Sequence, residues 1–318
     1  MINQPTLTAI IGPTAVGKTA FAVALAQRIG GEIISADSRQ IYRGMEIGTA
    51  KPTPAEQAAV VHHLIDICDP DAEFSLAMYQ DLAMTAIAGV HARGRLPLLV
   101  GGTGQYLAAV LEGWQIPRVP PHPDIRADLE RQAAERGIAA LHAWLVAVDP
   151  SAAQQIGPTN LRRIVRALEV YLVSGQPISA QQTRQPPPYM IRTIWLQRER
   201  EELYRRADIR VDAMLSAGLL EEVAHLRSQG YAWELPAMSS LGYMQLRPYL
   251  EGEASLAACI ERLKFDTHNF IRRQGAWFRR LPQLEPIMLE DAGTSQLDRI
   301  VASFTPTDQP VHEPKELS

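Results

Sequence analysis

Residues 6–19 read TLTAIIGPTAVGKT, a β-branched apolar run followed by the pattern G-x-x-x-x-G-K-[ST]. The pattern predicts a buried strand at 6–11, a tight turn, and a helix from Lys18 to about Ile29. Such a turn points backbone N–H groups at phosphate oxygens, while the lysine supplies a point charge and the Thr19 hydroxyl suits Mg²⁺. The sequence therefore predicts a phosphate-binding loop formed by Gly12, Pro13, Thr14, Ala15, Val16, Gly17, Lys18 and Thr19.

Strands and helices alternate on both sides of this loop. Strands are predicted at 32–36 (EIISA), 95–102 (RLPLLVGG) and 191–197 (IRTIWLQ), and QYLAAVLEG after the second of these reads as a helix. Further helices are predicted at 199–216, 218–229 and 253–279. The alternation is typical of an α/β fold, a P-loop-type parallel sheet flanked by helices.

A proline-rich stretch, GWQIPRVPPHPD, marks a change of composition after residue 112. Residues 124–146 and 161–175 then show apolar residues at helical spacing, and Gly175 is a candidate C-cap. We expect a mostly helical insertion domain at 113–189, between a core at 1–112 and a return to the core with C-terminal helices at 190–300. Residues 301–318, which end in the polar, proline-bearing stretch TPTDQPVHEPKELS, are expected to form a flexible tail.

Composition limits the class of protein. The 318 residues carry a net charge of −4, which gives no global sign of nucleic-acid binding. Cys68 and Cys259 lie far apart without metal-ligand spacing, so a disulfide framework or a zinc finger is not expected. No window approaches the ~18 apolar residues of a membrane span, and we expect a cytoplasmic protein without membrane association.

Asp37 and Thr103 are candidate site residues because each follows a predicted strand of the sheet. Ligands of open parallel sheets bind at that carboxyl edge. Asp37 is either a general base or Mg²⁺ ligand, or the N-cap of the next turn. Thr103 either binds a phosphate or bridging oxygen, or is an ordinary turn residue. No carboxylate ends the strand before Thr103, which favours a small transferase over a motor or switch ATPase.

Two basic stripes stand out in a chain of negative net charge. NLRRIVRALEV contains Arg162, Arg163 and Arg166, and residues 261–280 hold six Lys/Arg against two acids, interleaved with aromatic residues. Arginine with aromatics is typical of phosphate contact combined with base stacking. Solvated helix faces whose aromatics enter the core would give the same pattern.

Taken together, several segments resemble the tRNA dimethylallyltransferase family: GPTAVGKT, ADSRQIYRGMEIGTAKP, HHLIDICDP, LLVGGTGQYL, NLRRIVRALEV, GLLEEV, LGYMQL and RRQGAWFRR. They follow the family's order from residue 7 to about 280. The resemblance implies transfer of the dimethylallyl group from dimethylallyl diphosphate to N6 of the adenosine 3′ of the anticodon. The loop would then hold the diphosphate of the prenyl donor.

The resemblance also implies roles for individual residues. Asp37 would accept the N6 proton, Thr103 would contact the oxygen that links the prenyl group to diphosphate, and Arg210 would neutralise the diphosphate. Thr14, Lys18 and Thr19 would hold diphosphate and Mg²⁺. The tRNA anticodon stem-loop would contact Asp37, Ser38, Arg39, Gln40, Arg126, Arg162, Arg163, Ile164, Val165, Arg166, Gly242, Tyr243, Arg272, Arg273, Trp277 and Arg279. No protein partner is implied, and we expect a monomer.

Three positions depart from the family's usual pattern, namely Met244, Gly275 and Ala276, and all three bear on the grip on tRNA. Three other functions stay open. A small-molecule kinase would bind ATP, a prenyltransferase acting on free AMP or ADP would not need the basic stripes, and a tRNA-binding module would not need both Lys18 and Asp37. His62 and His63 lack partners at metal spacing and read as loop or core residues.

Overall fold

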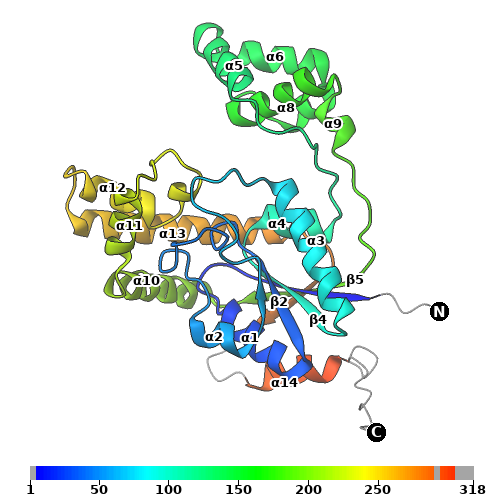
Figure 1. Cartoon of the computed structure of the whole chain (residues 1–318), viewed down its shortest axis with the longest axis vertical. Helices are drawn as coiled ribbons and strands as arrows, with labels where there is room; N and C mark the ends of the chain where they lie inside the picture. Colours follow the sequence, from blue (N-terminus) through cyan, green and yellow to red (C-terminus); the bar gives the residue numbers. More distant parts are fainter. Residues whose placement is uncertain (1–4, 290–293, 305–318) are drawn as a thin grey trace. The chain divides into compact units, whose positions relative to one another are not determined.

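The computed structural model describes residues 5–289 and 294–304, which form two compact units. One unit comprises the chain up to Leu111 and again from Pro188, and the other is Glu112–Pro187. The first unit is an α/β sheet structure, and the second, in green in Figure 1, is helical.

A six-stranded parallel sheet organises the first unit, in the order β3-β2-β4-β1-β5-β6. The strands are β1 (Thr6–Ile11), β2 (Gly31–Ala36), β3 (His62–His63), β4 (Leu96–Gly101), β5 (Met190–Gln197) and β6 (Leu284–Met288). Strands β1, β2 and β4 are buried on both faces, so their sequences are mostly apolar and do not alternate between apolar and polar residues. The expected P-loop-type α/β fold is confirmed, as are the strands predicted around the phosphate loop.

Helices pack against the sheet, and the helices after β5 make up much of the rest of this unit. They are α1 (Lys18–Ile29), α2 (Pro54–Ala59), α3 (Leu76–Ala92), α4 (Gly104–Leu111), α10 (Arg200–Ser216), α11 (Leu219–Ser228), α12 (Tyr243–Leu250), α13 (Leu256–Phe278) and α14 (Thr294–Ser303), with a 3₁₀ turn η1 at Ala237–Ser239. Helix α1 contacts β2, β4 and α14, whereas α3 contacts β2, β4 and α4. The long helix α13 contacts α4, which follows β4, and it also contacts α10 and α12.

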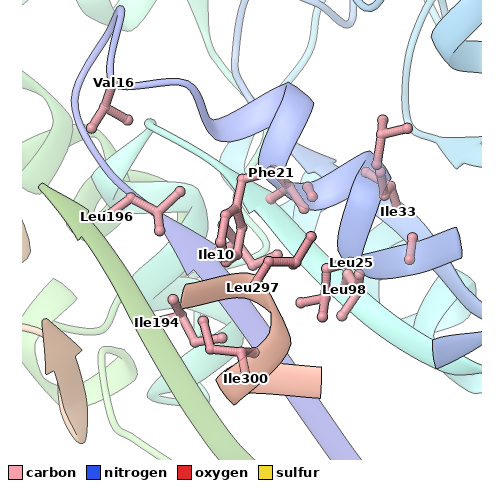
Figure 2. Close-up of a cluster of buried hydrophobic side chains, with 14 of the residues drawn as sticks. Ile10, Val16, Phe21, Leu25, Ile33, Leu98, Ile194, Leu196, Leu297 and Ile300 are labelled. Carbon is pink, nitrogen blue, oxygen red and sulfur yellow. The ribbon is translucent and has the colours of Figure 1, made fainter. Parts of the chain in front are cut away.

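The core of the sheet unit lies between β1, β4, β5 and α1. Ile10, Leu98 and Ile194 are fully buried there, and Leu297 and Ile300 of α14 pack onto the same cluster (Figure 2). The flexible tail expected from residue 301 is corrected for its first residues. Helix α14 continues to Ser303 and Phe304 is buried, because the apolar face of this helix completes the core. Residues 305–318 lie outside the described residues.

The second unit contains α5 (Pro123–Arg136), α6 (Ile138–Val148), α7 (Pro150–Gln155), α8 (Leu161–Ser174) and α9 (Ile178–Gln181). Its own core includes Leu129, Leu145 and Leu168. The helix expected over 124–146 is two helices, because Gly137 at φ 85° ends α5 and begins α6. Gly175 caps α8 in the left-handed conformation, as predicted.

The segments that enter and leave the helical unit run side by side. Gln115 N–H donates to Thr183 O and Gln185 N–H to Gly113 O, each at 2.8 Å. Glu112 pairs with Arg184 at 2.8 Å in the same place. The unit is therefore closed at its base by an antiparallel pair of connecting segments.

Candidate active site

The loops that follow β1, β4 and β2 meet at one edge of the sheet, because these three strands are neighbours. The phosphate-binding loop after β1 is strongly curved, with Ala15 at φ 66° and Gly17 at φ 107°. Gly12 is needed at the start of the loop, since a Cβ there would lie 2.8 Å from the Leu196 carbonyl oxygen of β5.

Cationic side chains fix the carbonyl groups of this loop. Lys18 Nζ donates to Pro13 O at 2.9 Å within the loop itself. Arg198 Nε donates to Val16 O at 3.0 Å and Arg206 Nε to Ala15 O at 3.2 Å, from the segment that follows β5. The peptide planes of the loop are thus held from outside, and its surroundings are positively charged.

A cavity of about 460 Å³ opens beside the loop. Its charged lining residues are Lys18, Asp37, Glu56, Arg205, Arg206 and Arg210. Four cations against two carboxylates give an excess of positive charge in a concave site. Such a site favours an anionic ligand, and its size suits a small molecule.

The environment of Lys18 disfavours its charged form. Burial, and secondly the nearby Arg210 guanidinium, lower the pKa of Lys18 from 10.5 to about 8, although Asp37 opposes the shift. Burial likewise lowers the pKa of Arg210, again opposed by Asp37. An anion placed between these two cations would relieve their repulsion, so the electrostatics of the site favour a phosphate-bearing ligand.

Asp37 has contacts that fit both of its predicted readings. Its Oδ1 accepts a hydrogen bond from Arg39 N–H at 2.9 Å, which caps the turn after β2. The same side chain lines the cavity with Lys18 and Arg210. A carboxylate held by its own turn and open to a ligand can act as a positioned base.

Thr103 lies against the Asp37 turn. Its Oγ1 accepts from Ser38 N–H at 3.0 Å and donates to Ser38 Oγ at 3.3 Å. It does not line the cavity itself. The structure thus joins the loops after β2 and β4 through the hydroxyl that the sequence singled out.

Residues 38–40 are largely engaged inside the protein. Gln40 accepts from Ser35 Oγ at 3.1 Å and donates to Ala50 O at 3.1 Å, while it also lines the cavity. Arg39 donates to Pro236 O and to Ser239 Oγ. These bonds tie the turn after β2 to the segment that precedes α12.

A carboxylate from α11 holds the next loop. Glu222 accepts from the backbone N–H groups of Glu46, Ile47 and Gly48 at 2.8, 2.8 and 3.0 Å. That loop leads directly to Thr49 and Ala50, which line the cavity. Glu222 therefore positions one wall of the site from a distance.

Helix α13 presents two different faces near this edge of the sheet. Arg272, Arg273 and Arg279 are exposed, as a nucleic-acid contact would require. Gln274 is buried, and Trp277 packs on Gly104, where a Cβ would lie 2.3 Å from the indole ring. Of the predicted tRNA residues in this segment, the three arginines are thus exposed and Trp277 is half-buried.

The side chains of three of the predicted tRNA-contact residues are buried inside the protein. Ile164 and Val165 lie in the core of the helical unit, at 0% and 4% exposure, because they form the apolar face of α8. Tyr243 is fully buried, and its hydroxyl donates to Glu222 rather than facing a ligand. Gly242 adopts φ 95° at the start of α12, and its N–H is bonded to Gln245 Oε1.

The arginines of the helical unit also fall into two groups. Arg162 and Arg163 are exposed at the start of α8. Arg126 and Arg166 both bind the buried carboxylate of Glu169, at 2.7 Å and 2.6 Å. Burial alone would raise the pKa of Glu169, but the bonds from Arg126, the His122 N–H and Arg166 lower it. Arg126 and Arg166 therefore hold α5 and the segment before it against α8.

Sequence reasoning missed several residues of the site. Arg206 stands one helical turn before Arg210, and this i, i+4 spacing could have revealed it. Arg198, Glu222 and Gln274 lie far along the chain from the loops they hold. Glu222 and Gln274 fall within the segments GLLEEV and RRQGAWFRR, but nothing in those segments indicates which loop each side chain contacts. Among the described residues no cluster of three metal-ligating His, Cys, Asp or Glu side chains occurs. Nor does any described helix have the length and apolarity to cross a membrane.

Comparisons with known proteins agree with this geometry. A family profile described as IPP transferase matches residues 40–281, and one described as isopentenyl transferase matches residues 5–68. The tRNA dimethylallyltransferase of Chloroflexus aggregans is 70% identical over 88% of this chain and 94% of its own. That of Herpetosiphon aurantiacus is 56% identical over 97% and 98%.

Two solved structures resemble the chain as a whole. The tRNA isopentenylpyrophosphate transferase of Bacillus halodurans matches with a TM-score of 0.69 and 40% identity, over 93% of this chain and 94% of that one. A eukaryotic dimethylallyltransferase, described as acting on tRNA, matches with a TM-score of 0.81 and 25% identity, over 98% and 81%.

Proposed function

The chain belongs to the tRNA dimethylallyltransferase family, and we propose that it transfers the dimethylallyl group of dimethylallyl diphosphate to N6 of the adenosine immediately 3′ of the anticodon in tRNA. The observation that carries this proposal is the cavity in which the phosphate-binding loop, the half-buried cations Lys18 and Arg210 and the Asp37 carboxylate meet. It holds an anion-binding site and a base within one small space.

The donor's diphosphate would lie on the loop at Thr14, Lys18 and Thr19, with Arg206 and Arg210 on its other side. Diphosphate is a poor leaving group until its developing negative charge is neutralised. Fixed cations in a partly water-excluded site supply that stabilisation, which is usually the largest catalytic contribution. The reduced pKa of Lys18 would return toward its ordinary value once the diphosphate is bound.

The transfer itself needs one bond formed and one broken. The adenine N6 lone pair attacks C1 of the prenyl group, and the C1–O bond breaks with its electron pair moving to the diphosphate oxygen. Asp37 accepts the N6 proton, while its bond from Arg39 N–H keeps the carboxylate oriented. Thr103 does not line the cavity and its hydroxyl bonds Ser38, so that hydroxyl would have to turn toward the linking oxygen when the substrates bind.

The residues present are compatible with Mg²⁺. The cavity offers the Thr19 hydroxyl and the carboxylates of Asp37 and Glu56, all of them hard oxygen donors. Mg²⁺ commonly takes few protein ligands and is completed by phosphate oxygens and water. A bound ion would add charge neutralisation at the diphosphate.

The anticodon stem-loop would be bound by exposed arginines. Arg162 and Arg163 of the helical unit, Arg272 and Arg273 of α13, and Arg279 directly after α13 are exposed and able to contact phosphates. The target base would have to leave the stack of the loop to reach Asp37, which costs a few kcal/mol. The chain would need no protein partner for this and would act as a monomer.

A labelling experiment tests the proposal. Purified protein and Mg²⁺ would be incubated with radiolabelled dimethylallyl diphosphate and either an adenosine-rich anticodon stem-loop or AMP. We expect label in the stem-loop only, and its loss when the target adenosine becomes guanosine. Label in AMP alone would replace the tRNA reaction by prenylation of free nucleotides.

A further inference from the structure

We propose that Gln274 is a positioning residue that sets the geometry of the phosphate-binding loop from helix α13. This inference rests on the proposed function for its kinetic consequences, but the contacts that carry it do not. Gln274 Oε1 accepts from Thr14 N–H at 2.9 Å, and Gln274 Nε2 donates to Gly102 O at 3.0 Å. One side chain thus bridges the loop after β1 and the loop after β4.

Gln274 differs from the rest of the buried face of α13, because its polar atoms bond to other elements. The buried stripe of α13 consists of Cys259, Leu263, Thr267, Ile271, Gln274 and Phe278. The other polar member of the stripe, Thr267, donates to Leu263 O of its own helix. Gln274 is 6% exposed and sends both of its polar atoms to other elements. A buried amide that satisfies a donor and an acceptor together is costly to replace.

Two glycines in the loop after β4 allow α13 to come close enough for this bridge. Gly102 leaves room for it, since a Cβ at that position would lie 2.5 Å from Gln274 Nε2. Two residues on, Gly104 makes room in the same way for Trp277. Because Thr103 lies between these glycines, the bridge also defines where the loop after β4 presents the hydroxyl that holds Ser38.

An amide side chain suits position 274 better than a carboxylate or an apolar side chain. A carboxylate could accept from Thr14 N–H, but it would face the Gly102 carbonyl without a proton and add negative charge beside the site for diphosphate. An apolar side chain would leave Thr14 N–H and Gly102 O buried without these partners. The side chain of glutamine is neutral and carries both donor and acceptor atoms, so it can satisfy the one donor and the one acceptor that the two loops present here.

Two variants of Gln274 and one control test this role. In Gln274→Leu both bonds are lost at nearly constant volume, and in Gln274→Glu only the acceptor is kept. Gln80→Leu serves as control, because Gln80 Nε2 bonds Ala109 O between α3 and α4, away from the phosphate loop. We expect Gln274→Leu to raise the KM for dimethylallyl diphosphate about tenfold and to lower kcat, with the KM for the stem-loop unchanged. Gln274→Glu should raise the first KM further.

Two direct measurements separate this inference from the proposed function. Calorimetric binding of inorganic diphosphate should weaken about tenfold in Gln274→Leu and stay within twofold in Gln80→Leu. Hydrogen exchange at the Thr14 amide should accelerate at least tenfold in Gln274→Leu, whether or not the protein transfers prenyl groups. A lowered melting temperature with unchanged diphosphate binding and unchanged KM and kcat would show a merely structural role and overturn the inference. Thr14 exchange equal to that of the unsubstituted protein would also overturn it.

Discussion

The Tyr243 hydroxyl donates a hydrogen bond to Glu222 Oε1 at 2.6 Å, and the same carboxylate accepts from three consecutive backbone N–H groups of the loop at 46–48. Burial, and next the charge of Glu222, raise the pKa of Tyr243, so the phenol remains a donor throughout the working pH range. We call Glu222 and Tyr243 the clamp of the loop at 46–48. The clamp matters because this loop continues into the cavity wall at Thr49 and Ala50.

Removing parts of this clamp should destabilise the protein in graded steps. Tyr243→Phe loses one bond and should lower the free energy of unfolding by about 1 kcal/mol. Glu222→Ala removes the shared acceptor of the buried Tyr243 hydroxyl and of three backbone N–H groups, so it should cost more, about 3 kcal/mol. Urea unfolding measures both, with the exposed Tyr249→Phe as a control expected to stay within about 0.5 kcal/mol. Equal losses in the two clamp variants would contradict a shared carboxylate.

Asp37→Asn tests the assignment of the base. Asparagine can still accept from Arg39 N–H, so the turn should persist, but it cannot take a proton from N6. We expect kcat to fall by about 10²–10⁴-fold. Diphosphate should bind at least as tightly, because a negative charge has left the cavity. Single-turnover transfer to the stem-loop at the rate of the unsubstituted protein would remove Asp37 from this role.

The pH dependence of donor binding follows from Lys18. Its pKa of about 8 in the folded protein lies below its ordinary value of 10.5, because burial and Arg210 disfavour the charged form. Between these two values the unfolded chain binds the proton more strongly than the folded one, so the contribution of Lys18 to stability rises with pH. Diphosphate, however, needs the protonated lysine. The dissociation constant for inorganic diphosphate should therefore rise from about pH 8 upward, by at most about tenfold per pH unit.

Calorimetric titrations between about pH 7 and about pH 9.5 would show this break. In Asp37→Asn the break should move to lower pH, because Asp37 supports the charge on Lys18. A dissociation constant that stays level across the range would contradict the lowered pKa.

Arg210→Gln should lower kcat/KM for the donor by about 10²–10³-fold, since it removes a fixed cation from the leaving group. Arg28→Gln is the matched control. Arg28 pairs with Asp298 at the surface between α1 and α14 and does not line the cavity. Steady-state transfer assays compare the two, and a loss of similar size in both variants would mean that Arg210 acts through stability.

Salt dependence distinguishes surface arginines from the buried residues beside them. The double variant Arg162→Gln, Arg163→Gln should weaken stem-loop binding and reduce the slope of log affinity against log salt by roughly 0.7–0.9 for each phosphate that the variant no longer binds. Ile164→Ala should leave that slope unchanged and lower the free energy of unfolding by about 2–5 kcal/mol, because Ile164 is fully buried. An unchanged slope in the double variant would argue against phosphate binding at α8.

The elements with strong local signals were predictable from sequence. The phosphate loop, its flanking strand and helix, and the C-cap at Gly175 depend on neighbouring residues, and all appear where the pattern places them. Helix α3 was not predicted, since its exposed Met78 and Leu82 blur the contrast between its two faces. Strand β6 was missed as well. It contains Pro286, which is tolerated because β6 lies at the edge of the sheet.

The site was only partly predictable, for a related reason. Asp37, Thr103 and Lys18 follow strands, so their common edge can be inferred from chain order alone. Arg206, Glu222 and Gln274 act on backbone groups between roughly 170 and 260 positions away. Such bonds produce no periodic pattern in the sequence. The partner of a polar residue on a helix can be identified only when the tertiary packing is known.

The position of β1 has a consequence for biosynthesis. This strand pairs with β4 on one side and with β5 on the other, but the whole helical unit from Glu112 to Pro187 is translated between β4 and β5. On the ribosome, β1 can therefore join β4 and β2 well before its second neighbour emerges. Until then the half-built sheet displays an unpaired apolar edge, which is the kind of surface that chaperones bind and that nascent chains pair through by mistake. Early folding of the helical unit would bring the two connecting segments together and shorten this exposure.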